Sequence, residues 1–433
     1  MAYKTCKDLE SSLYLGPDQF RACCQRFFYE GKMRGDAPLI NLNKNSSPTA
    51  KQILNARINL YNKIQNDEAE ACKGCRYIEE VDNPPQITNN ISHLSIEHHS
   101  VCNLRCTYCS EIYYGGKKPH YKVDEFVKNL SEENCLNNCK QIVWGGGEPT
   151  ADKSFQKTLE NIDHSSSPDL YHRVFTNSVV YREVVEEFLK KGLIKIITSV
   201  DAGTEETFIK VRGRNRIRNV FENLHKYSRY KPSDVAIKYI ITNENNSEYE
   251  LKEFVKKCVK YDLVDCCFQI SVNYKYEKLS LSQLNSIGFL MGSLMKENIK
   301  KVYVDDHIMA RFASLNSNER VKLENFLKIH NLENILIDPK KYDSIILFGA
   351  GQIAKELITK TNFFKKINSF DIIDTSSKKI GTKFLGKKIQ GMELLENDNR
   401  NLIISAVQSF DDIYSIILNK KGTNQNILCG LVI

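Results

Sequence analysis

Alternating and periodic apolar positions predict a series of strands and helices across the middle of the chain. Between residues 91 and 300, short apolar segments alternate with amphipathic ones. The predicted strands are 92–97, 140–144, 171–176, 194–200, 234–242 and 263–272. Helical periodicity lies between them, for example over 183–191 and 249–260. Six such β–α units predict an α/β domain with a parallel sheet curled into a partial (β/α)6 barrel.

The first ninety residues have little strand pattern. A turn-rich stretch at 31–48 precedes apolar residues at helical spacing, from residue 50 to about 67. We therefore expect residues 1–90 to form a small module that precedes the barrel domain at 91–300.

The C-terminal part has a pattern of its own. Residues 301–340 mix charged and apolar positions at helical spacing and are predicted to be a connector. Beyond it, a strand ends at Gly349-Ala-Gly351, a helix follows, and a second strand ends at Asp374. This is the Rossmann layout, in which the glycines and the helix N-terminus bind phosphate and the acid binds a ribose. We expect a Rossmann-like domain at 341–433, too short for both halves of a dinucleotide fold; a structural domain without a ligand is the alternative.

Composition and charge narrow the classes of function. The formal charge of +8 comes from Lys and Arg spread through all 433 residues, which indicates a solvated surface and not a nucleic-acid-binding stripe. No run is long and apolar enough to span a bilayer. Fourteen cysteines without a signal-peptide pattern favour a cytoplasmic protein that uses thiols as metal ligands.

Three of these cysteines form the most informative motif of the chain. Cys102, Cys106 and Cys109 give C-x3-C-x2-C directly after the first predicted barrel strand. Thiolate is the ligand of iron–sulfur clusters, and three thiolates within eight residues can surround one metal centre. Three ligands leave one iron of a four-iron cube open for chemistry. A zinc loop with a distant fourth ligand is the alternative.

Polar and glycine residues follow the next three strands, at the sheet edge where α/β sites collect. Gly145-Gly-Gly-Glu-Pro149 follows the second strand, Thr176-Asn177 the third, and Ser199-Val-Asp201 the fourth. Glycines let the backbone approach a ligand closely, and a carboxylate beside them suits an ammonium group.

The cysteine triplet and the glycine turn together resemble the signature of the radical S-adenosylmethionine (radical SAM) enzymes. The resemblance implies a [4Fe–4S] cluster on the triplet, with the amino-acid end of SAM on the free iron. It also implies which residues contact SAM. The expected cofactor-binding residues are Tyr108 (adenine), Gly146, Gly147 and Glu148 (amino group), Ser199 (ribose), Arg212 (carboxylate), and Asn177 and Asp201 at the strand ends. For Arg212, a surface ion pair is the alternative.

A second cysteine set lies in the N-terminal module. Cys6, Cys23, Cys72 and Cys75 have the layout of a closed four-thiolate site, with Cys24 able to replace Cys23 and structural zinc an equal alternative on spacing alone. The arrangement resembles the auxiliary-cluster modules called SPASM and twitch, although those normally follow the radical SAM domain. The resemblance implies one further [4Fe–4S] cluster.

The remaining cysteines of the barrel region are predicted to be small core residues. They are Cys135, Cys139, Cys258, Cys266 and Cys267.

These resemblances imply an enzyme that cleaves SAM reductively to a 5′-deoxyadenosyl radical, which abstracts hydrogen from a substrate C–H bond. An electron donor such as flavodoxin or ferredoxin is implied, and the auxiliary cluster is expected to take the substrate electron. The C-terminal module resembles nucleotide-sugar-binding modules of polysaccharide enzymes. It therefore favours oxidation or epimerisation of a carbohydrate or nucleotide-sugar; peptide modification is the runner-up.

The rival class of function is non-enzymatic, an iron–sulfur electron carrier or scaffold. The glycine turn and Tyr108 argue against it, because a carrier needs neither SAM contact. No residue can be named as a catalytic acid or base, since the pose of the substrate is not fixed.

Overall fold

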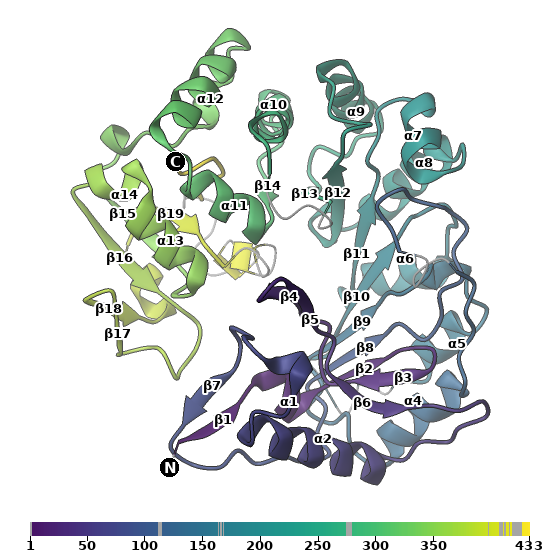
Figure 1. Cartoon of the computed structure of the whole chain (residues 1–433). Helices are drawn as coiled ribbons and strands as arrows, with labels where there is room; N and C mark the ends of the chain where they lie inside the picture. The colour runs from purple at the N-terminus through teal and green to yellow at the C-terminus, as the bar shows by residue number, and fades with distance from the viewer. Residues whose placement is uncertain are drawn as a thin grey trace. The chain divides into compact units, whose positions relative to one another are not determined.

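The structure is a computed structural model (Figure 1) that describes residues 2–110, 115–162, 164, 167, 169–273, 279–396, 398–406, 410, 413–414, 416–417 and 427–433. It divides into two units, Met1–Ile197 and Thr198–Ile433. The division falls within strand β11 (Ile194–Ser199).

The first unit contains the cysteine motifs. Its strands are β1 (Tyr3–Thr5), β2 (Ser12–Leu15), β3 (Gln19–Arg21), β4 (Arg26–Tyr29), β5 (Lys32–Gly35), β6 (Pro38–Asn41), β7 (Glu79–Val81), β8 (His93–Ile96), β9 (Gln141–Trp144) and β10 (Tyr171–Thr176). Its helices are α1 (Lys7–Ser11), α2 (Ala50–Gln65), α4 (Val123–Glu132), α5 (Phe155–Glu160) and α6 (Glu183–Lys190), with 3-10 turns η1 (Glu70–Cys72) and η2 (Pro149–Ala151).

The first three predicted barrel strands are confirmed as β8, β9 and β10. They are parallel, with Ile96 opposite Trp144 and Trp144 opposite Val174. All three of these side chains are buried, as expected of strands that are covered on both faces.

Three N-terminal strands extend the same sheet. Strand β2 runs parallel to β8, with Ser12 opposite His93 and Leu15 opposite Ile96. Strands β3 and β6 then add in antiparallel order beyond β2. Residues 1–90 therefore contain several short strands that their sequence pattern does not reveal. Strand β2 is buried at all four positions, and β3 and β6 have one buried residue or none, so these short strands lack the alternation by which a strand is recognised.

Arg57 connects helix α2 to this extended sheet. Its guanidinium is fully buried and donates hydrogen bonds to the carbonyls of Ser12, Thr88 and Asn90, at 2.8–3.2 Å. Burial lowers the pKa of Arg57 to about 10, which leaves it charged at neutral pH. The three acceptors compensate a buried charge that would otherwise be costly.

The second unit begins with the end of β11. Its further strands are β12 (Val235–Ile241), β13 (Cys267–Val272), β14 (Val302–Val304), β15 (Ser344–Phe348), β16 (Ser369–Ile373), β17 (Lys383–Phe384), β18 (Lys387–Gln390) and β19 (Asn401–Ile404). Its helices are α7 (Glu205–Arg212), α8 (Ile217–Ser228), α9 (Glu248–Lys260), α10 (Leu281–Lys296), α11 (Asp306–Ala313), α12 (Ser317–Ile329), α13 (Gln352–Lys360) and α14 (Asn362–Lys366). Its 3-10 turns are η3 (Pro232–Asp234), η4 (Glu333–Ile335), η5 (Pro339–Lys341) and η6 (Met392–Glu396).

Strands β12 and β13 match the last two predicted barrel strands and pair in parallel. The predicted connector at 301–340 differs from expectation, because it begins with β14, which pairs in parallel with β13. Helices α11 and α12 make up most of the rest of this stretch.

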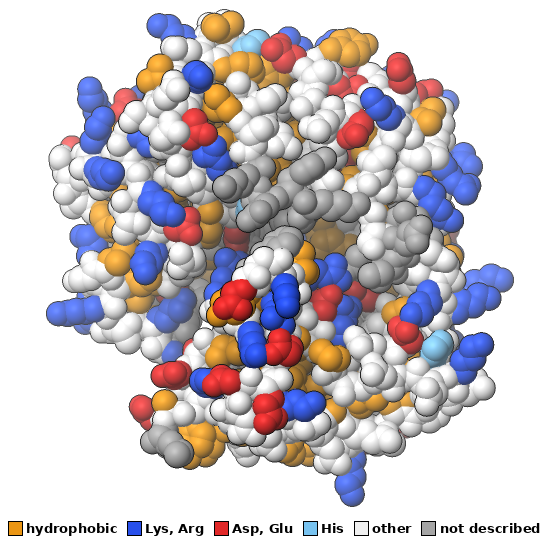
Figure 2. Space-filling view, viewed as in Figure 1, with side chains coloured by type: hydrophobic (Ala, Val, Ile, Leu, Met, Phe, Trp, Pro, Cys, Tyr) orange, Lys and Arg blue, Asp and Glu red, His pale blue; other side chains and the backbone are white. Residues whose placement is uncertain are grey.

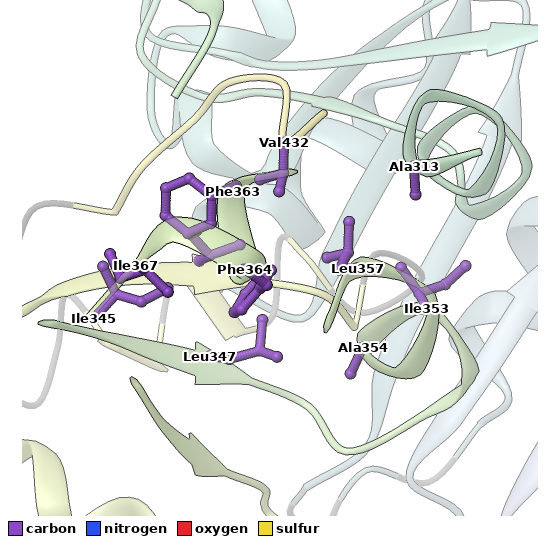
Figure 3. Close-up of a cluster of buried hydrophobic side chains, with 11 residues drawn as sticks. Ala313, Ile345, Leu347, Ile353, Ala354, Leu357, Phe363, Phe364, Ile367 and Val432 are labelled. Atoms are coloured by element: carbon purple, nitrogen blue, oxygen red, sulfur yellow. The ribbon is translucent and has the colours of Figure 1, made fainter. Parts of the chain in front are cut away.

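The C-terminal residues form a separate five-stranded sheet in the order β17-β18-β16-β15-β19. All neighbours are parallel except β17 and β18. Ile345 and Leu347 of β15 pack on one face of the sheet against Leu357 of α13 and Phe363 of α14 (Figure 3). Ile346 and the other alternate positions of β15 pack on the opposite face, as the period of two requires.

The surface carries charge of both signs. Figure 2 shows Lys and Arg side chains spread over the face in view and interspersed with Asp and Glu. None of the described helices combines the length and the apolar character needed to cross a membrane.

Candidate functional site

The cysteine triplet lies in the segment that follows β8. Cys102, Cys106 and Cys109 are all half-buried. The Leu104 amide donates to Cys102 Sγ at 3.5 Å, and Asn177 Nδ2 lies 3.8 Å from the same sulfur. Donors of this kind favour the thiolate form that binds iron. The chemistry of the site therefore fits an iron–sulfur cluster.

The glycine turn after β9 lies directly against the chain that leads into the cysteines. The Gly147 amide donates to the His99 carbonyl at 2.9 Å, and the Glu148 amide donates to the Val101 carbonyl at 2.8 Å. A Cβ atom on Gly147 would lie 2.2 Å from the Val101 oxygen, so only glycine fits there. Gly146 has φ of +84°, a conformation that also favours glycine.

Glu148 connects this turn to the end of β10. Its Oε1 accepts hydrogen bonds from the amide and hydroxyl of Thr150, at 3.1 and 2.6 Å, and from the Thr176 hydroxyl at 2.6 Å. Its Oε2 accepts from the Asn177 amide at 2.6 Å. Burial raises the pKa of this carboxyl, while the four donors oppose the rise. Glu148 thus organises the chain's own loops; contact with the SAM amino group stays a prediction.

Asn177 completes the connection between the strand ends and the cysteines. Its side-chain Nδ2 donates to Asn103 Oδ1 at 2.6 Å, inside the cysteine segment. The structure therefore brings the triplet, the glycine turn and the end of β10 together. Thr176 was singled out with Asn177 at the strand end, whereas Thr150 and Asn103 were missed by sequence reasoning because single polar residues have no distinctive spacing.

The same residues lie inside the part of the chain that a known family matches. Residues 96–255 match the Radical SAM superfamily. The chain contains a radical SAM domain. This domain implies a [4Fe–4S] cluster, SAM as cofactor, and an enzymatic function.

Several known proteins are similar in sequence to part of this chain. GTP 3',8-cyclase of Clostridium botulinum is 27% identical over 177 residues, which are 40% of this chain and 54% of the cyclase. GTP 3',8-cyclase of Haemophilus influenzae is 28% identical over 156 residues, 34% of this chain and 45% of that enzyme. The chain thus spans about half the length of the curated relatives it matches. Among solved structures, Streptococcus suis SuiB bound to precursor peptide SuiA is similar with a TM-score of 0.42 and 12% identity, over 75% of this chain and 78% of SuiB.

Asp201 and Arg212, two of the predicted SAM contacts, lie in the second unit and form a buried ion pair. Arg212 Nη1 donates to Asp201 Oδ2 at 2.7 Å, and the side chains are 5% and 0% exposed. Asp201 Oδ1 also accepts from the Ile240 amide at 2.7 Å. The alternative of a surface ion pair for Arg212 is therefore wrong, because the pair is internal. Contacts of Ser199, Asp201, Arg212 and Tyr108 with SAM stay predictions.

Upstream of the radical SAM domain, four thiols face one cavity. It is lined by Cys6, Cys23, Cys72 and Cys75, with apolar side chains such as Leu60 around them. Burial, with a smaller contribution from the neighbouring thiols, raises the pKa of the Cys6 and Cys72 thiols to about 12. Bound metal cations would reverse this effect, since they stabilise thiolates.

The structure distinguishes the two adjacent cysteines of the N-terminal module. Cys23 lines the cavity with the other three thiols, whereas Cys24 interacts with the Tyr14 hydroxyl and is not among the lining residues. Cys23 is therefore the member of the set that faces the other thiols. The five cysteines predicted to be core residues are all buried, which confirms that interpretation.

The C-terminal module brings its three predicted residues together. Asp374 Oδ2 accepts from the amide of Ala350, between Gly349 and Gly351, at 2.9 Å. It also accepts from Lys379 Nζ at 3.2 Å. Burial opposes ionisation of Asp374, but these bonds outweigh it and lower the pKa. Sequence reasoning missed Lys379, which also donates to the Ala350 carbonyl at 3.2 Å.

The two glycines of that module differ in their surroundings. Gly349 has φ of +103°, and a Cβ atom there would lie 3.0 Å from Ser405 Oγ. Gly351, at the N-terminus of α13, has no atom of a described residue within 4 Å of an added Cβ. The backbone conformation at position 349 thus requires glycine, whereas the absence of a side chain at Gly351 leaves open space at the N-terminus of α13.

The glycine turn after β9 allows a sharp test with two neighbouring positions. In Gly147→Ala the new methyl group meets the Val101 carbonyl, so we expect SAM affinity to fall about tenfold or more. In Gly145→Ala the nearest atom is 3.6 Å away, and we expect affinity within about twofold of wild type. Equilibrium dialysis of SAM against the reconstituted proteins measures both values. Equal losses in the two variants would contradict the close backbone approach at Gly147.

Proposed function

We propose that the chain is a radical SAM enzyme with two iron–sulfur clusters that oxidises or epimerises a carbohydrate or nucleotide-sugar. The observation that carries the two-cluster part is the convergence of Cys6, Cys23, Cys72 and Cys75 on one cavity. The carbohydrate part rests on the C-terminal module.

The cofactor of the radical SAM domain supplies a 5′-deoxyadenosyl radical, which removes hydrogen from an unactivated C–H bond. The protein's own residues hold and orient it. Cys102, Cys106 and Cys109 are the ligands we assign to the cluster. The Gly146–Gly147 turn packs closely on the chain that leads into the cysteines, and Glu148 holds the turn in the position that we assign to the methionine end of SAM.

A cluster fits the N-terminal thiols better than a single zinc ion. Zinc holds its thiolate sulfurs about 3.8 Å apart, because each Zn–S bond is about 2.3 Å. Three or more His, Cys, Asp or Glu ligand atoms that all lie within 4.8 Å of one another make a compact group. Within the described ranges, the only such group consists of His98, His99 and Asp152. No three of the four sulfurs are therefore as close as a zinc ion requires. Wider spacing supports a four-iron cube, whose corners each take a different thiolate.

The C-terminal sheet supports a nucleotide-binding role. Numbered along the module, its parallel strands β18, β16, β15 and β19 stand in the order 3-2-1-4, which is the first four positions of the Rossmann order 3-2-1-4-5-6. Gly351 and Asp374 lie at the carboxyl ends of these strands, where such folds bind nucleotides. The GTP 3',8-cyclase relatives act, by name, on a nucleotide. A nucleotide-linked sugar therefore remains the substrate class we favour over a peptide.

Reductive cleavage of SAM tests the enzymatic proposal. We expect anaerobically reconstituted protein to convert SAM to 5′-deoxyadenosine when dithionite supplies the electron, because the triplet leaves one iron open for SAM. Liquid chromatography with mass spectrometry detects the product. Cys106→Ala is the control, and a wild-type yield no higher than that of this variant would contradict the proposal.

Iron content tests the second cluster. We expect about eight irons in the wild type and about four in Cys23→Ser, since each cube holds four. Cys24→Ser should retain about eight, because Cys24 interacts with Tyr14 and does not face the other thiols. Both variants should still yield 5′-deoxyadenosine. About four irons with one zinc in the wild type would instead support the structural-zinc alternative.

Thermal stability tests ligand binding by the C-terminal module. A nucleotide or nucleotide-sugar that binds the folded state should raise the melting temperature of the full chain at concentrations well above Kd. Gly351→Val should remove this rise without changing the melting temperature of the free protein, because its side chain enters open space. If a broad panel of nucleotides and sugar-nucleotides gives no rise with the wild type, the module is structural.

A further inference from the structure

Two histidines and an aspartate form a compact group just before the cysteine triplet. His98 and His99 follow β8, and Asp152 follows the 3-10 turn after the glycine turn. One ligand atom from each of the three residues lies within 4.8 Å of the other two. The two histidines are only 5% and 4% exposed. None of the three is needed for the cluster or SAM contacts assigned above.

The hydrogen bonds of this group are incomplete. His98 Nε2 lies 3.1 Å from Asp152 Oδ2, and His99 Nδ1 accepts the Val101 amide at 3.1 Å. The other ring nitrogens, His98 Nδ1 and His99 Nε2, are buried and have no hydrogen-bond partner among the residues that the structure describes. Buried polar atoms without partners are rare and costly, so two in adjacent rings indicate that something binds there.

The protonation states suit a metal cation. Burial, with the neighbouring His98, lowers the pKa of His99 to about 4, so the ring is neutral at pH 7. Burial acts to raise the pKa of Asp152, but the hydrogen bonds from His98 and Ser154 outweigh it and hold the carboxyl ionised. Neutral imidazole and ionised carboxylate are the forms that coordinate metal ions.

The spacing is close to that of a mononuclear site. Ligand atoms about 2.0–2.2 Å from a tetrahedral zinc ion are about 3.3 Å from one another. His98 Nε2 and Asp152 Oδ2, at 3.1 Å, already meet this spacing. His99 Nε2, which has no partner among the described residues, is the nitrogen left for the ion, because Nδ1 accepts the Val101 amide.

We propose that His98, His99 and Asp152 bind a divalent transition-metal ion, separate from the cysteine-ligated centres. Two imidazoles and one carboxylate suit zinc or ferrous iron, whereas the sulfur sets suit clusters. Three protein ligands leave a coordination position for water or for an oxygen atom of a small molecule. The site is thus of the open kind, unlike a closed structural zinc site.

Zinc binding by the reconstituted full chain tests this site. The cysteines are first filled by anaerobic iron–sulfur reconstitution, and loosely held metal is removed with a chelator. Zinc is then titrated, and bound zinc and iron are measured by mass spectrometry after gel filtration. We expect one zinc per chain, and X-ray absorption at the zinc edge should show nitrogen and oxygen neighbours without sulfur.

Matched variants assign the zinc to these residues. His99→Gln and Asp152→Asn should each weaken zinc binding about tenfold or more at unchanged iron content. Asp152→Asn carries the test if His99→Gln disturbs the fold, because the amide oxygen still accepts the bond from His98. His330→Ala, a histidine outside the group that pairs with Glu248, should bind zinc as the wild type does. No zinc in the wild type, sulfur neighbours, or full zinc binding by Asp152→Asn would overturn the proposal.

Discussion

The buried carboxylate of Glu148 is the interaction on which the arrangement of the radical SAM site depends. It accepts hydrogen bonds from Thr150, Thr176 and Asn177, which belong to the segments after two neighbouring strands. Each unsatisfied donor left by its removal would cost about 1–3 kcal/mol. Because Asn177 also bonds to Asn103 beside the first cysteine, the position of the cysteine loop follows from the same carboxylate.

Backbone hydrogen bonds between the glycine turn and the segment before the cysteines also fix the position of the cysteine loop. The amides of Gly147 and Glu148 extend the ladder between β8 and β9 beyond the strands themselves, onto the carbonyls of His99 and Val101. Side chains are excluded at this contact, since a Cβ on Gly147 would overlap the Val101 carbonyl. The His98–His99 pair lies in the same segment, so the proposed divalent-metal site and the cysteine triplet share one rigid support.

Chemistry was easier to predict from the sequence than topology. Cys102, Cys106 and Cys109 are recognised because few kinds of site place three thiols so close together, and the long apolar strands such as β10 and β12 are recognised by their length. Strands β2, β3, β6 and β14 have only three or four residues each, and the pairing of β2 with β8 joins segments that are distant in sequence. Local periodicity carries no information on such contacts.

The structure was also needed to decide which of two candidate residues faces a site, and which partner a charged residue has. Cys23 and Cys24 are equivalent in sequence, and the direction of each side chain separates the cavity from Tyr14. Arg212 has the right charge for a carboxylate ligand, yet its buried partner is Asp201. Lys379 beside Asp374, and the pairing of His98 with Asp152, lack any fixed spacing that a sequence pattern could reveal.

We propose that the chain holds two clusters and that one of them binds SAM. Low-temperature electron paramagnetic resonance of the dithionite-reduced protein, recorded with and without SAM, tests it most directly. For the wild type we expect two [4Fe–4S]⁺ signals, of which SAM shifts one. When Cys72 and Cys75 are both replaced by alanine, we expect a single signal that SAM still shifts. A wild-type spectrum in which SAM shifts no signal would contradict the binding of SAM at a cluster.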